Sequence, residues 1–221
     1  MPDYVAACKL SALSGVRIGI PRNVISLLSS DLSRPVTDAF EQALGVLRAA
    51  GATIIENANF TAAAEFRNSR LGTVILEADF VINLQSYLES LSNNPTNITS
   101  LADLRQFTKS FALEGYPLRD TGRWDEALDG WNNTDPRFWP AYQQNLYYGG
   151  EGGVLGAIER NNLDAIVLPT DFASDWAAPV GSPIVTVPLG SYPAGVPITN
   201  NSWGLVTSAP NMPYVRYFQM L

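Results

Sequence analysis

The 221-residue sequence is 46% hydrophobic and 10% aromatic, a composition typical of a folded globular chain rather than a disordered one. Its formal net charge of −7 argues against nucleic acid and anionic membrane surfaces as partners. No apolar stretch approaches the roughly 20 residues that cross a bilayer, and the opening MPDYVAACKL lacks the pattern of a secretory signal, so we expect no membrane span and, by default, a cytoplasmic location.

The residue types that most often carry catalysis are scarce in this sequence. There is no His, which excludes a Ser-His-Asp or Cys-His mechanism and removes the commonest metal ligand. Cys8 is the only cysteine, so an internal disulfide and a cysteine-based metal site are also excluded. Lys9 and Lys109 are the only lysines. We therefore expect no metal and no cofactor, and a hydrolase would need a lysine or carboxylate route.

The first sixty residues have the pattern of a βαβ unit. A short apolar strand is predicted over 15–21, and apolar residues then recur at three- and four-residue steps over 36–50, which indicates an amphipathic helix. Pro35 lies near the first turn of this helix and Gly51 follows its last residue, as expected at the two ends. A second strand is predicted over 52–56, parallel to the first.

The middle of the sequence is mostly helical. One long helix is predicted to begin at residue 71 and to end before Asn93. A shorter one over 100–107 has Ser100 as its N-cap, with Asp103 placed as the acid of a capping box. We expect a helical turn over 124–128 and a helix over 141–160 that continues in spite of its glycines.

Two short apolar strands are predicted near the end of the chain, over 162–170 and 184–187, and both have the composition of buried strands. Residues 195–201 are a candidate hairpin partner for the second of them. The fold class that follows is α/β, with a helical excursion between the βαβ unit and the late strands.

Several sequence features resemble functional motifs but have simpler explanations. The glycine-rich stretch GGEGGVLG, residues 149–156, fits the spacing of neither phosphate-binding fingerprint, so we predict close helix packing or a kink there. Asp171 and Asp175 are expected to cap or solvate a loop rather than to form a glycosidase-like acid–base pair. Ser29 and Ser30 are expected to cap a helix rather than to act as nucleophiles.

Two further groups of residues also have structural or incidental explanations. Aromatic residues gather in the connection before residue 143, and we expect them to pack that connection onto the core rather than to line a pocket: Trp124, Trp131, Phe138, Trp139 and Tyr142. Four Asn-x-Ser/Thr sequons begin at Asn59, Asn97, Asn132 and Asn200, and without a signal peptide they carry little weight.

Seven stretches, in order along about residues 3–197, resemble the amidase-signature family, especially its fungal members: DYVAACKLSALSGVRIGIPRN, ALGVLRAAGATIIENANF, LEADFVINLQSYLESL, NPTNITSLADLRQF, DTGRWDEAL, GGEGGVLGAIERNNLDAIVLPT and SPIVTVPLGSYPAG. The resemblance implies a mixed β-sheet flanked by helices and hydrolysis of carbon–nitrogen amide bonds. Residues 1–221 would be a single partial domain, with residues 214–221 a tail that departs from the family pattern.

The family works through a Ser–cis-Ser–Lys triad whose serines lie in and just before a Gly/Ser-rich signature. A lysine–serine relay is compatible with the absence of His. The stretches matched here belong to the part that follows the signature, and neither Lys9 nor Lys109 has the family's lysine context. The resemblance therefore implies a C-terminal portion that is inactive by itself, with no catalytic residue carried over.

The resemblance also implies a contribution to the substrate site. Five residues would form part of a pocket wall for a small amide substrate: Thr170, Asp171, Phe172, Gly181 and Ser182. Ordinary turn chemistry explains the same residues equally well.

Two alternatives remain open at the level of sequence. One is a non-catalytic binding or regulatory protein derived from half an amidase fold, and the other is a truncated gene model. If central strands are missing, unpaired edges beside residues 165–168 and 183–187 would favour self-association through strand edges.

Overall fold

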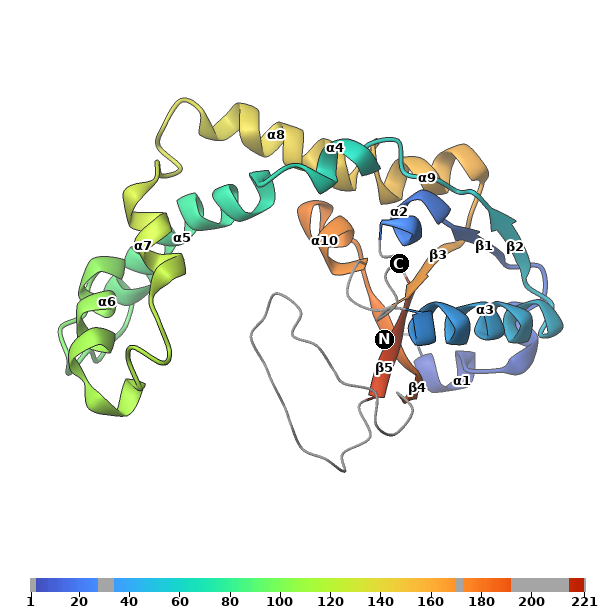
Figure 1. Cartoon of the computed structure of the whole chain (residues 1–221), viewed down its shortest axis with the longest axis horizontal. Helices are drawn as coiled ribbons and strands as arrows, with labels where there is room; N and C mark the ends of the chain where they lie inside the picture. The colour runs from blue at the N-terminus through green and yellow to red at the C-terminus, as the bar shows by residue number, and fades with distance from the viewer. Residues whose placement is uncertain (1–2, 28–33, 170–172, 192–214, 221) are drawn as a thin grey trace. The chain divides into compact units, whose positions relative to one another are not determined.

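The computed structural model describes residues 3–27, 34–169, 173–191 and 215–220 (Figure 1). The chain divides into two compact units, a sheet unit of Met1–Glu65 with Tyr147–Leu221 and a helical unit of Phe66–Leu146. The helical unit corresponds to the excursion predicted from the sequence.

The sheet unit contains a five-stranded mixed sheet. Its strands are β1 (Arg17–Ile20), β2 (Thr53–Glu56), β3 (Ala165–Pro169), β4 (Val185–Ser191) and β5 (Val215–Met220), in the order β2-β1-β3-β5-β4. β1 pairs in parallel with both β2 and β3, whereas β5 pairs antiparallel with both β3 and β4. The α/β class and the four expected strands over 15–21, 52–56, 162–170 and 184–187 are confirmed.

The late strands differ from expectation in three ways. β3 has a neighbour on each side, so the expected unpaired edge beside residues 165–168 is wrong. Residues 195–201 lie outside the described residues, and the strand that pairs with β4 is β5, formed by the tail that departs from the family pattern. β4 is also not buried, since Val185 is 60% exposed and Val187 is 43% exposed.

The βαβ unit explains how β1 and β2 come to lie side by side. After β1 the chain forms the short helix α2 (Arg22–Ser26), and α3 (Arg34–Ala49) then leads to β2. Val36, Phe40 and Leu44 are spaced four residues apart on α3 and are all buried, so this helix turns one apolar face to the core. Gly51 follows α3 with a φ of +96°, the left-handed conformation expected of a glycine beyond a helix end.

β3 supplies the centre of the core. Ile166, Val167 and Leu168 have no exposed surface, as is typical of a strand covered on both faces. Helix α9 (Val154–Asn161) precedes β3, and the Arg17 side chain on β1 donates hydrogen bonds to the carbonyls of Asn161 and Asn162 at 3.1 and 2.7 Å. These bonds fix the turn between α9 and β3 against β1.

The N-terminal end of the sheet unit carries two short helices, α1 (Tyr4–Ala7) and the 3₁₀ helix η1 (Leu10–Leu13). Asp3 caps α1, because its side chain accepts a hydrogen bond from the backbone N–H of Ala6 at 2.9 Å.

Helices and turns make up the helical unit. They are the end of α4 (Ala63–Arg67), α5 (Leu71–Glu89), α6 (Leu101–Ser110), the 3₁₀ helix η2 (Ala112–Glu114), α7 (Gly122–Asp129) and most of α8 (Phe138–Gly149). Its core contains Ile75, Ala78 and Phe138, with partly buried apolar neighbours that include Trp131 and Tyr142. The aromatic residues at these positions pack as predicted, whereas Trp139 is 64% exposed.

The predicted cap of α6 is confirmed. The Ser100 hydroxyl accepts the backbone N–H of Asp103 at 3.1 Å, and the Asp103 carboxylate accepts the Thr99 backbone N–H at 3.1 Å. The hydrogen bond from Ser100, followed by those from Thr99, holds the pKa of Asp103 below its usual value.

The single helix expected over 141–160 is wrong. α8 ends at Gly149 and α9 begins at Val154, so the glycine-rich stretch separates two helices instead of passing through one. The alternative prediction for this stretch, close packing, is confirmed below. Within the described residues, no helix has the length and apolar character to cross a membrane.

Candidate functional site

The carboxyl ends of β1, β2 and β3 lie at the same edge of the sheet, because the three strands run parallel. Open α/β sheets place ligands at this edge. Three segments follow these strand ends in the chain: α2 after β1, residues 57–62 after β2, and α10 (Ala173–Ala177) after β3. We take this edge as the candidate site.

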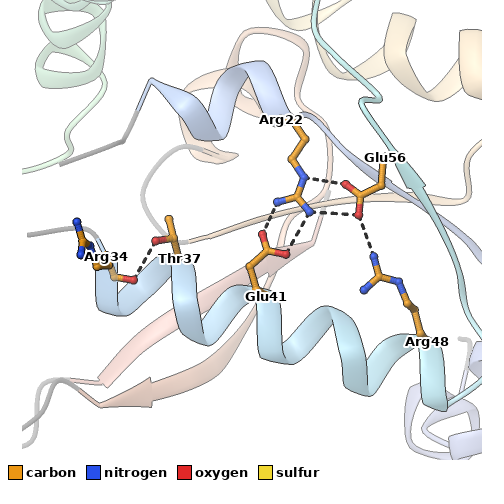
Figure 2. Close-up of polar contacts among 6 residues, drawn as sticks. All are labelled: Arg22, Arg34, Thr37, Glu41, Arg48 and Glu56. Carbon is orange, nitrogen blue, oxygen red and sulfur yellow. Dashed lines mark hydrogen bonds and ion pairs between the residues drawn. The ribbon is translucent and has the colours of Figure 1, made fainter. Parts of the chain in front are cut away.

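An ion-pair network anchors the first segment (Figure 2). Arg22, the first residue of α2, binds Glu41 of α3 and Glu56 at the end of β2. Its Nε lies 2.7 Å from Glu56 Oε2, and Arg48 Nη2 reaches Glu56 Oε1 at 2.8 Å. The two arginines and two glutamates neutralise one another and join α2, α3 and β2.

The network changes the proton affinity of two of its members. Hydrogen bonds to Glu41 and then to Glu56 raise the pKa of Arg22 above its usual value. The hydrogen bond from Arg22 lowers the pKa of Glu56; burial opposes this shift, and Arg48 adds to it. Both groups are therefore held in their charged forms, as a structural anchor requires.

Asn23 clamps the second segment. Its side-chain amide donates to the Phe60 carbonyl at 2.7 Å and accepts the Phe60 backbone N–H at 3.2 Å. Its own backbone N–H donates to the side chain of Asn59 at 3.1 Å. The loop after β2 is thus fixed against the start of α2.

Trp176 anchors the third segment. It lies on α10, is 2% exposed, and packs edge-on against Phe60 with ring centroids 4.8 Å apart. The segment that follows β3 is consequently held against the segment that follows β2.

Glycines at the end of α8 and in the turn before α9 lie close to Trp176 or to the loop after β2, and we call Gly149, Gly152 and Gly153 the glycine seat. A Cβ atom added at Gly149 would lie 2.7 Å from the Trp176 carbonyl oxygen, and one at Gly153 would lie 3.0 Å from the Trp176 ring. The Gly152 carbonyl accepts the backbone N–H of Ala62 at 2.9 Å. The predicted close packing is therefore confirmed, and it is directed at the candidate site.

The structure describes two of the five predicted wall residues. Thr170, Asp171 and Phe172 lie outside the described residues, as do Ser29 and Ser30, so the capping roles expected of Asp171, Ser29 and Ser30 stay predictions. Gly181 and Ser182 follow the 3₁₀ helix η4 (Ala178–Val180), which continues from α10.

Gly181 and Ser182 form a Schellman-type cap. The Ser182 N–H donates to the Ala177 carbonyl at 3.1 Å, and the Gly181 N–H donates to the Ala178 carbonyl at 3.2 Å. Gly181 has a φ of +65°, the left-handed conformation that this motif requires. The turn chemistry considered from the sequence is present at these two residues, and a substrate-binding role for them stays a prediction.

The structure places the two lysines in different surroundings. Lys9 is exposed and precedes η1. Lys109 Nζ lies 3.4 Å from Asp125 Oδ1 and 5.7 Å from the centre of the Tyr116 ring, in the helical unit. Lys109 is thus part of an ion pair with Asp125.

Metal-binding groups of three or more His, Cys, Asp or Glu side chains do not occur within the part of the chain that the structure describes. Sequence reasoning missed Arg22, Asn23 and Trp176. For Trp176 the glycine-rich stretch was a signal, because its small residues indicate that another segment approaches closely, whereas the sequence analysis offered no signal for Arg22 or Asn23.

Known proteins resemble this chain in both sequence and fold. No family model matches the chain. The chain is 52% identical over 214 residues to the "Putative amidase" of Arthroderma benhamiae, an alignment that covers 96% of this chain. Its fold matches the peptide amidase of Stenotrophomonas maltophilia with a TM-score of 0.74 over 100% of this chain, at 24% identity. The predicted resemblance to the amidase-signature family is confirmed. The predicted mixed sheet flanked by helices is confirmed by this likeness.

A second amidase-family structure, from Bacillus anthracis, matches with a TM-score of 0.71 at 19% identity over 99% of this chain. The chain covers a much smaller share of each relative's own length. The chain spans 36% of the Arthroderma protein, 43% of the peptide amidase and 37% of the Bacillus protein. It corresponds to part of the amidase domain, and by sequence resemblance to the C-terminal part.

Proposed function

We propose that this chain forms one wall of the substrate site of an amide-hydrolysing enzyme and does not itself supply the Ser–Ser–Lys triad. The observation that carries the proposal is the anchoring of α10 by Trp176. Because the Trp176 ring packs against Phe60 and Gly153, the helix that leads to the cap at Gly181 and Ser182 is held near the carboxyl edge of the parallel strands.

The composition and the lysine environments support the second half of the proposal. Without His, an activated serine requires a neutral lysine or a carboxylate nearby. Lys109 is paired with Asp125, and Lys9 is exposed on a short N-terminal turn. Hydrolysis would therefore depend on residues supplied by another part of an amidase domain.

A direct test is to treat the purified chain with a fluorophosphonate probe and to assay it with C-terminally amidated dipeptides. We expect neither covalent labelling nor release of ammonia. Stoichiometric labelling of one serine, located by mass spectrometry, would contradict the absence of an activated nucleophile.

The wall itself can be tested by titrating a ¹⁵N-labelled chain with an amidated dipeptide. We expect the largest shifts at the amides of Gly181 and Ser182, and none at Gly45, a glycine of α3 with open space around it. Shifts confined to the helical unit would contradict a binding role for the cap.

A second candidate is a non-catalytic binding protein, which the pairing of β3 on both sides favours. Such a protein would be monodisperse. If another part of an amidase domain normally covers β4, the chain by itself should instead self-associate through that edge strand. Sedimentation over a hundredfold concentration range separates the two, and Val187→Lys should suppress association because a charge on an edge strand disfavours pairing.

A further inference from the structure

We propose that Gly149 is a positioning residue for the candidate pocket wall, acting through Trp176 and Pro179 on the cap at Gly181 and Ser182. The inference rests on the proposed function only in taking that cap as part of a substrate site. The positioning itself is a statement about this chain and can be tested without catalysis.

Gly149 lies in a tightly packed space. This residue ends α8 and is buried. A Cβ atom built on it would lie 2.7 Å from the Trp176 carbonyl oxygen and 3.2 Å from both Pro179 Cβ and Val180 Cγ1. The nearest atom belongs to the backbone, so a side-chain rotation cannot relieve the collision, and either α8 or the segment after Trp176 must move.

The α8 side of this contact is the more firmly held. The Gly152 N–H donates to the Tyr147 carbonyl and the Gly156 N–H donates to the Gly150 carbonyl, both at 2.9 Å. The Tyr148 hydroxyl donates to the Glu65 carboxylate at 3.1 Å. Movement of the end of α8 would disturb all of these bonds together.

The segment after Trp176 has fewer constraints. The Trp176 ring is fixed by Phe60 and Gly153, but Ala178 is exposed and Pro179 is only half-buried. Two capping bonds from Gly181 and Ser182 connect this turn to its own preceding residues. A methyl group at Gly149 should therefore displace residues 177–182 while leaving the ring in place.

Other glycines provide matched comparisons. Gly45 lies inside α3, and a Cβ atom there would meet nothing within 4 Å, so Gly45→Ala adds the same methyl group without a collision. Gly153 is unsuitable because an added Cβ would collide with the Tyr148 carbonyl of its own turn. At Gly149, an added Cβ atom would collide with the segment that leads to the cap, and not with the turn that carries the glycine itself.

The experiment compares ¹H–¹⁵N spectra of the wild-type chain, Gly149→Ala and Gly45→Ala, each titrated with an amidated dipeptide. For Gly149→Ala we expect displaced resonances of Gly181 and Ser182, a retained cooperative thermal transition, and roughly tenfold weaker dipeptide binding, the loss that 1.4 kcal/mol of misplaced contact produces. Gly45→Ala should keep both the resonances and the affinity of the wild type.

Unchanged Gly181 and Ser182 resonances in folded Gly149→Ala would overturn the positioning role, whatever happens to binding. Displaced resonances with unchanged dipeptide affinity would support the positioning role and overturn the wall assignment in the proposed function.

If Gly149→Ala does not fold, Pro179→Gly tests the same contact from the opposite side without adding volume. This change should loosen the turn and speed hydrogen exchange at the Gly181 and Ser182 amides, while the Phe60 amide keeps its wild-type rate. Unchanged exchange at both cap residues would overturn the proposal.

Discussion

The two units of this chain are stabilised in different ways. All of the largest fully buried side chains except Leu101 belong to the sheet unit, including Trp176, Phe40 and Phe60. In the helical unit, by contrast, Leu113 is 85% exposed and Leu118 is 94% exposed. The candidate site therefore belongs to the more tightly packed unit, in which we expect substitutions to be tolerated less well.

The helical unit depends more on polar contacts at its surface. The Asp125 carboxylate accepts hydrogen bonds from Thr121 at 3.0 Å and from Arg105 at 2.9 Å, joining α6 to α7. Burial raises the pKa of Asp125, but these bonds and the one from Lys109 outweigh it, and the net shift is downward. Such contacts contribute little individually and tolerate substitution. We therefore expect a substitution in the sheet unit to cost more unfolding free energy than a substitution of the same size in the helical unit.

The sharpest test of this contrast exchanges one tryptophan in each unit for alanine. Trp176→Ala removes a buried anchor and should cost about 3–5 kcal/mol of unfolding free energy. Trp139→Ala removes a mostly exposed ring and should cost less than about 1 kcal/mol. Urea denaturation measures both, and equal losses would contradict the difference between the units.

Backbone conformation at the wall gives the next largest effect. Gly181 has a φ of +65° and open space around it, so a substitution there tests conformation without collision. Gly181→Val should cost about 1–2 kcal/mol, because a β-branched residue disfavours the left-handed region. Gly181→Asn should cost less, since asparagine tolerates this region. Thermal unfolding of the pair measures the difference, and equal losses would mean that the cap does not require the left-handed conformation.

The ion-pair network predicts a pH dependence in the sheet unit. The pKa of Glu56 is lower in the folded chain than in the unfolded one, so its stabilising contribution is present above about pH 4.3 and is lost as the pH falls through the folded value. Because the Glu56 side chain is 40% exposed, we expect only a few tenths of a kcal/mol. Glu56→Gln should be slightly less stable than wild type at pH 7 and should lose less stability between pH 5 and pH 3.

The matched control for this prediction is Glu159→Gln on α9, a residue that is exposed and forms no ion pair with other described residues. It should follow the wild-type pH profile in urea denaturation. A Glu56→Gln profile identical to wild type would show that the network does not stabilise the fold.

The smallest effect is expected in the helical unit. Arg123 is 70% exposed in its side chain and lies 3.5 Å from both Glu77 and Glu126. Arg123→Ala should change the unfolding free energy by less than about 0.5 kcal/mol, because exposed ion pairs are screened by water and salt. A loss above about 1 kcal/mol would mean that the helical unit depends on its surface pairs more than the contrast allows.

Local patterns in the sequence predict much of the fold. Pro35, the spacing of Phe40 and Leu44, and Gly51 define α3 with little reference to the rest of the chain, and the apolar run of β3 predicts a buried strand. These features depend on neighbours along the sequence, which the sequence displays directly.

The missed features depend on contacts between distant segments. At the break between α8 and α9, Gly149 and Gly153 lie close to Trp176, and nothing within residues 141–160 reveals that partner. The Asn23 side chain donates a hydrogen bond to the Phe60 carbonyl, and the tail at 215–220 pairs with β3. The candidate site consists of such long-range contacts, which is why its wall could be located only through family resemblance.

The place of β5 in the sheet has a consequence for biosynthesis. Met220 pairs with Val167 of β3 and with Val185 of β4, so β4 joins the sheet through a strand that comes later in the chain than every other described strand. During synthesis, β1, β2 and β3 can therefore pair before β4 has its strand partner. A chain shortened to end before residue 215 should lose the pairing of β4 with the sheet, and hydrogen exchange at the β4 amides would then be faster than in the full chain.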